Sequence, residues 1–129
     1  MRTFKTRLFG RFARKERITD AMVCEAVRRL RSGQVDADLG GGVIKQRIAR
    51  AGGGKSGGYR SIVLFRQRGH VFFAHGFAKS DQASIGPEEL KGFKALAKEM
   101  LAFDEAKLTI ALRDHVIEEV FCDDEAVQE

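Results

Sequence analysis

The sequence predicts a single small α+β domain built on a twisted, mainly antiparallel sheet. Its 129 residues, 43% of them hydrophobic, suit one domain with one core. Apolar residues alternate with a period of two near the N-terminus and again in the middle of the chain, and they recur at helical spacing on both sides of that middle block. We therefore expect an N-terminal strand, two helices, a three-stranded meander and then C-terminal helices, all within one domain over residues 1–129.

The first strand and helix lie close to the N-terminus. Phe4, Thr6 and Leu8 alternate with basic residues, which is the pattern of a half-buried strand. Helical spacing begins at Phe9 and continues to Ala13. A strand followed directly by a short helix is thus expected.

A second helix and a loop follow. Thr19 and Asp20 supply N-terminal capping chemistry, and Gly33 marks the end of the helix. The apolar stripe between them consists of Val23, Ala26, Val27 and Leu30. We expect Asp36 to Gly42 to be a loop, because acidic residues and three consecutive glycines disfavour regular structure.

Three apolar segments in the middle of the chain predict the meander. The strands are expected at Val43–Arg50, Tyr59–Arg66 and Val71–Ala78, with a short hairpin connection between the last two. On the first of these strands, Lys45 and Arg47 share one face and lie about 7 Å apart.

Helices are expected in the C-terminal part. Pro87 opens one in the usual first position, and its buried stripe consists of Leu90, Phe93, Ala97 and Met100. A last helix is expected from Asp104 to about Val120, although its apolar residues spread widely around the axis. An acidic tail completes the segment 104–129.

The net charge of +5 hides an asymmetry. Residues 1–70 hold 17 Lys and Arg against 5 Asp and Glu, whereas residues 71–129 hold 6 against 13. A surface as basic as the first part attracts polyanions, of which nucleic acid is the most common inside a cell. A solvated basic face without a ligand is the alternative.

Composition also indicates where the protein works. The chain has no apolar run long enough to span a bilayer, and its basic N-terminus lacks the apolar stretch of a secretory signal. We expect a soluble, cytoplasmic protein without a membrane partner. Cys24 and Cys122 show no metal-ligand spacing, and we expect them to be reduced, inert thiols. We expect no metal and no cofactor.

The glycine-rich segment Ala49–Arg60 is close to a phosphate-binding loop of nucleotide hydrolases. Ala49 replaces the first glycine of that motif, and the segment leads into aromatic and β-branched residues that favour a strand over a helix. A true loop of this kind opens a helix, whose N-terminus holds the phosphates. We therefore interpret the segment as a turn between two strands.

Several motifs together resemble the RelE/HigB toxins of bacterial toxin-antitoxin systems. The resemblance extends from about residue 3 to about residue 101. It is carried by Arg11–Lys15, Asp38–Gly42, Lys45–Arg50, Gly54–Arg60 and Gly76–Asp81. It implies a RelE-like fold and a ribosome-dependent endoribonuclease that cleaves mRNA and inhibits translation. It also implies neutralisation by a cognate antitoxin, which we expect to be of the helix-turn-helix type.

Four cations suit the chemistry of such an enzyme. Cleavage through attack by the 2′-hydroxyl needs a base, cations for the developing phosphorane charge and an acid, but no metal. We expect Lys45 as the base, because a lysine among other cations is more readily neutral. Arg47, Arg60 and Lys79 are expected on the phosphate. The alternative is that all are ordinary surface cations, and the general acid stays open.

Four further residues are candidates for RNA binding. Arg50 ends the strand of Lys45, and Lys55 lies in the glycine-rich turn. Tyr59 either stacks on a base or packs on the sheet, and His75 is either a catalytic or RNA-contacting residue or a hydrogen-bonded core residue.

Two further hypotheses remain. The scaffold could be a non-catalytic module that binds RNA or protein, which binding measurements alone do not distinguish from the enzyme. In addition, a mobile acidic segment could transiently cover the RNA-binding face. Its acidic residues are Asp114, Glu118, Glu119, Asp123, Asp124, Glu125 and Glu129.

Overall fold

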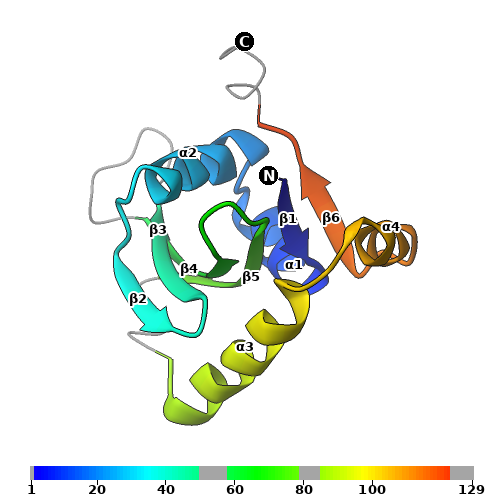
Figure 1. The fold of residues 1–129 in the computed structure, drawn as a ribbon. Coiled ribbons are helices and arrows are strands. Elements are labelled where there is room, and N and C mark those ends of the chain that lie inside the picture. The colour runs from blue at the N-terminus through cyan, green and yellow to red at the C-terminus, as the bar shows by residue number, and fades with distance from the viewer. Residues whose placement is uncertain (1, 50–57, 79–84, 123–129) are drawn as a thin grey trace.

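The computed structural model describes residues 2–49, 58–78 and 85–122, and it confirms the α+β class (Figure 1). The elements follow one another as β1 (Thr3–Thr6), α1 (Arg7–Glu16), α2 (Asp20–Arg31), β2 (Ala37–Gly40), β3 (Val43–Ile48), β4 (Tyr59–Phe65), β5 (Val71–Ala78), α3 (Pro87–Met100), α4 (Glu105–Arg113) and β6 (Ile117–Val120).

The strands form one mostly antiparallel sheet in the order β2-β3-β4-β5-β1-β6. The predicted meander is confirmed as β3, β4 and β5, in which β4 pairs antiparallel with both β3 and β5. The N-terminal strand β1 runs parallel to β5, with Thr3 opposite Val71 and Lys5 opposite Phe73. This pairing places the start of the chain beside its middle.

The prediction of a loop over Asp36–Gly42 is wrong in part, because β2 lies within it. β2 pairs antiparallel with β3, with Ala37 opposite Lys45 and Asp38 opposite Ile44. The glycines form the tight turn between these strands, and Gly42 has φ +83°. Local composition disfavoured a strand here, but hydrogen bonding to the edge of β3 stabilises one.

The prediction of one helix from Asp104 to about Val120 is also wrong. The helix α4 ends at Arg113, and the chain turns through His115 at φ 60° into strand β6. β6 pairs antiparallel with β1, with Ile117 opposite Thr6 and Val120 opposite Thr3. The wide spread of apolar residues in the sequence therefore reflects a change from helical to strand spacing.

Two of the acidic residues assigned to a mobile tail lie in β6. The Arg2 guanidinium donates hydrogen bonds of 2.8 and 2.7 Å to the two carboxylate oxygens of Glu119. The Glu118 carboxylate lies 3.6 Å from Arg14. These residues belong to the folded sheet, whereas Asp123–Glu129 lie outside the described residues.

Helices cover both faces of the sheet (Figure 1). α1 and α2 pack on one face over a core that includes Phe9, Val27 and Phe73. α3 and α4 pack on the other face over a core that includes Phe72 and Leu108. The predicted N-terminal signals are confirmed, since Thr19 caps α2 and Pro87 opens α3.

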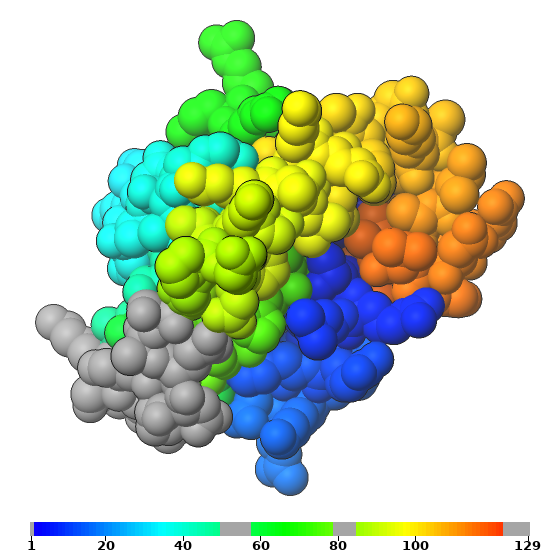
Figure 2. All heavy atoms as spheres, turned by 90° about the horizontal axis from the view of Figure 1, so that it is seen from below, coloured from blue at the N-terminus to red at the C-terminus, as the bar shows by residue number. Residues whose placement is uncertain are grey.

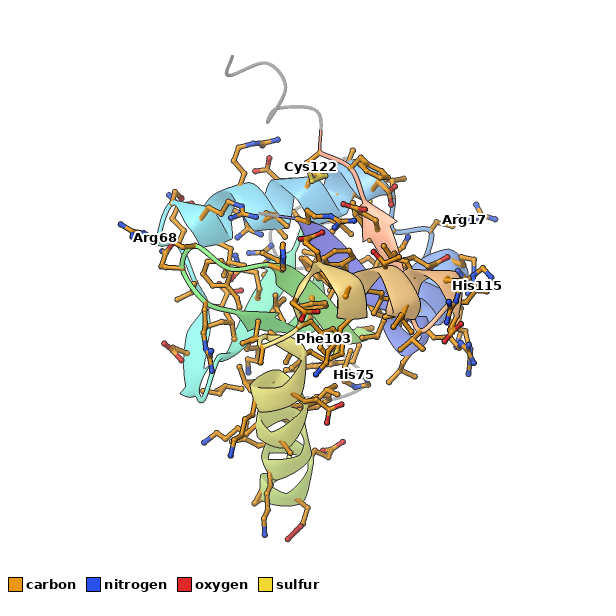
Figure 3. The ribbon with its side chains drawn as sticks, turned by 45° about the vertical axis from the view of Figure 1, so that its right-hand side comes forward. Arg17, Arg68, His75, Phe103, His115 and Cys122 are labelled. Atoms are coloured by element: carbon orange, nitrogen blue, oxygen red, sulfur yellow. A yellow bond between two sulfur atoms is a disulfide. The ribbon has the colours of Figure 1, made fainter. Side chains whose placement is uncertain are left out.

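The expectation of two reduced cysteines is wrong in this structure. Cys24 on α2 and Cys122 after β6 form a disulfide, with Cα atoms 5.5 Å apart. Figure 3 shows Cys122 beside α2. The sequence concealed this contact because 98 positions separate the two residues, and only the pairing of β6 with β1 brings them together.

No helix within the described ranges is long and apolar enough to cross a membrane.

Candidate functional site

Lys45 and Arg47 project from the sheet face that α3 covers. Their strand neighbours Ile44 and Ile48 belong to the core under α1 and α2, whereas Val43 belongs to the core under α3. Side chains alternate along a strand, so residues 43, 45 and 47 share the α3 face. Both cations are half-buried.

Arg60 joins them from the next strand. It lies directly opposite Arg47 in the pairing of β3 with β4, and Lys45 lies opposite Ile62. Directly paired residues have Cβ atoms about 4.5–5.5 Å apart and point to the same face. The structure therefore brings together three of the four predicted catalytic cations.

Each of the two arginines has one buried N–H group without a partner among the described residues. Nε of Arg47 and Nη1 of Arg60 are buried, and neither has a hydrogen-bond partner among the described residues. Buried charged donors without partners are costly, and two arginines at directly opposite positions on one face also repel each other. A phosphate between them would relieve both costs.

Contacts that the sequence did not reveal hold Arg47 in place. Its backbone N–H donates to the Asp36 carboxylate, and its carbonyl accepts a hydrogen bond from Arg29. Gly58 completes the surroundings, because a Cβ there would lie 2.8 Å from the Ile48 carbonyl oxygen and 3.2 Å from Nε of Arg47. The glycine before Tyr59 thus lets the two strands approach beside the arginine.

His75 lies on the same face, in the same cross-strand row as Lys45 and two strands away from it. It is opposite Ile62, which is itself opposite Lys45. Its ring is half-buried and lies 5.8 Å, centroid to centroid, from each of Phe77 and Phe93. Figure 3 shows it beside α3. His75 therefore packs against aromatic rings and also borders the cationic face.

Tyr59 points to the opposite face of the sheet. The residue is 7% exposed, its ring meets Phe12 edge-on at 5.8 Å, and its hydroxyl donates to the Glu16 carbonyl at 3.4 Å. A ring enclosed in this way is not available to stack on a base. The structure favours the packing alternative.

Three predicted site residues, Arg50, Lys55 and Lys79, lie outside the described residues. The elements flanking the glycine-rich segment are described: β3 ends at Ile48, and the antiparallel β4 begins at Tyr59. A nucleotide-binding loop leads into a helix, so the interpretation as a connection between two strands is confirmed.

Two further observations concern titratable side chains. Burial lowers the pKa of His70, whose Nδ1 accepts a 3.0 Å hydrogen bond from the Arg2 backbone N–H. Nowhere in the part of the chain that the structure describes do three His, Cys, Asp or Glu side chains gather as a metal-binding group.

A comparison with protein families decides the wider relationship. The family described as the RelE toxin of the RelE / RelB toxin-antitoxin system matches residues 1–120. The chain belongs to the RelE toxin family. This RelE-family match continues past residue 101, where the motif resemblance ended, and includes β6. Membership makes the chain a toxin of a toxin-antitoxin system and implies a cognate antitoxin. No curated protein matches the chain significantly.

Proposed function

We propose that this RelE-family toxin is an endoribonuclease that cleaves mRNA on the ribosome and thereby inhibits translation. One observation carries the proposal: Arg47 and Arg60 lie directly opposite each other, and each has one buried N–H group that finds no partner in the described part of the chain. Lys45 lies on the same face. This arrangement suits an anion with several oxygens, and the RNA backbone supplies one.

The mRNA supplies the nucleophile of the reaction, and residues of the chain assist it. Lys45 accepts the proton of a ribose 2′-hydroxyl, and the oxygen forms a bond to the adjacent phosphorus. Arg47 and Arg60 stabilise the extra negative charge of the phosphorane. The bond to the 5′-oxygen then breaks, leaving a 2′,3′-cyclic phosphate and, after protonation, a 5′-hydroxyl.

The remaining assignments combine the family resemblance with the positions of the residues in the sequence. Lys79 acts on the phosphate with the two arginines, while Arg50, Lys55 and His75 contact the RNA. The ribosome presents the mRNA, a helix-turn-helix antitoxin neutralises the toxin, and the cytoplasm is where all of these meet.

Alanine variants in a translation reaction test the proposal. The wild type is expected to cut a translated mRNA and to leave 2′,3′-cyclic phosphate ends. Lys45→Ala and Arg60→Ala should each lower the cleavage rate by roughly 10²–10³-fold, as expected for the loss of a base or a charge-stabilising donor. Lys107→Ala, on the exposed face of α4, is the matched control and should cleave normally.

The outcome separates the two functional classes. Ribosome binding without new mRNA ends in the wild type would contradict the enzyme and support the binding module. Cleavage that persists in Lys45→Ala and Arg60→Ala would place the active site elsewhere.

A further inference from the structure

An apolar hollow of about 250 Å³ lies between α1 and the C-terminal half of β5. We call it and its border the α1 surface, formed by Leu8, Arg11, Phe12, Lys15, His75 and Gly76. Leu8 is 51% exposed, which is unusual for a large aliphatic side chain. On the face shown in Figure 2, the blue N-terminal residues lie beside the yellow-green α3.

The aromatic rings that line the hollow are engaged in packing contacts within the protein. Phe12 packs so closely on Gly76 that a Cβ there would lie 2.4 Å from the Phe12 ring, and Tyr59 meets that ring edge-on. His75 stacks on Phe93. Proteins that bind single-stranded RNA stack its bases mainly on the open faces of aromatic rings. The hollow therefore suits an aliphatic side chain better than a base.

Cations border this hollow. A second hollow, of about 280 Å³, shares Arg11 with it and is also lined by Arg7 and Arg14. Arg14 contacts Glu118 at 3.6 Å, but among the described residues no carboxylate pairs with Arg11 or Lys15. Like charges at helical spacing destabilise a helix. The basic residues gathered on α1 therefore favour binding of an acidic partner from outside the chain.

We propose that the α1 surface is a docking site for the antitoxin. The occupant is an acidic, amphipathic segment that places an aliphatic side chain against Leu8 and pairs its carboxylates with Arg11 and Lys15. Aliphatic anchors surrounded by complementary charge are typical of protein interfaces. The inference rests on membership of the toxin family and goes beyond the proposed cleavage reaction.

The α1 surface lies close to the face that carries the candidate catalytic cations. β5 supplies His75 to the hollow, and on the same strand Phe77 lies opposite Arg60. A segment bound against His75 thus lies at the border of the cationic face. Docking on α1 places antitoxin beside the site where RNA is expected to bind.

Affinity for the antitoxin tests the proposal. The probe is the purified protein that is encoded beside this toxin and neutralises it. Leu8→Ser and Arg11→Glu should each weaken its binding at least tenfold, and the effect of Arg11→Glu should shrink at high salt. Ile110→Ser is the matched apolar control, since Ile110 is 48% exposed on α4, and Lys98→Glu on α3 is the charge control.

The controls should bind within twofold of the wild type, and melting temperatures should show that every variant is folded. Unchanged antitoxin affinity in both Leu8→Ser and Arg11→Glu would overturn the proposal. If ribosome binding fell instead, the surface would be an RNA contact. Because binding is measured directly, the result does not depend on whether the toxin cleaves RNA.

Discussion

The disulfide between Cys24 and Cys122 should contribute strongly to stability. It closes a loop over a sequence separation of 98 residues. In the chain-entropy model, a cross-link over a loop of this length raises the free energy of unfolding by about 4.7 kcal/mol at 25 °C. With an unfolding entropy of about 2.1 cal/mol/K per residue, reduction should lower the melting temperature of this 129-residue chain by roughly 17 °C.

Urea and thermal unfolding with and without reductant measure this difference. Cys122→Ser should unfold like the reduced wild type, and reductant should not destabilise it further. Thiol titration of the unfolded, unreduced wild type should find neither of its two cysteines reactive. Two reactive thiols, or equal stability of the oxidised and reduced proteins, would refute the reasoning.

Two further predictions concern packing and pH. Gly76→Ala should destabilise the protein by about 1–3 kcal/mol, because the new Cβ would lie 2.4 Å from the Phe12 ring. In a Phe12→Ala background the same change should cost almost nothing, and an equal cost in both backgrounds, measured by urea unfolding, would exclude this clash as the cause. Burial lowers the folded-state pKa of His70, so the unfolded chain binds the proton more tightly and stability should fall as pH drops below about 6.5. His70→Gln should weaken that pH dependence in thermal melts, whereas an identical profile would contradict it.

Local patterns were sufficient to predict much of the fold. Capping at Thr19 and Pro87 and the period-two segments are properties of neighbouring residues, and they gave two N-terminal helices, the meander and α3. β2 and β6 were missed because each depends on pairing with a strand outside its own segment. The disulfide was missed for the same reason, since it depends on where β6 lies.

The candidate site shows a similar division. Strand alternation was sufficient to place Lys45 and Arg47 on one face, and the pairing of β3 with β4 then added Arg60. No local pattern indicated that Asp36 would accept a hydrogen bond from the Arg47 backbone. Nor did the sequence decide between the two alternatives for Tyr59, because the choice depends on the direction in which the ring points.

The central claim is that Arg47 and Arg60 hold one and the same phosphate during cleavage. The most direct test compares the rates of mRNA cleavage on ribosomes for Arg47→Ala, Arg60→Ala and the double variant. Groups that act together on one charge are not additive, so the double variant should lose much less than the product of the two single losses. A loss in the double variant equal to the product of the two single losses would show that the arginines act independently and would contradict the claim, as would cleavage at the wild-type rate.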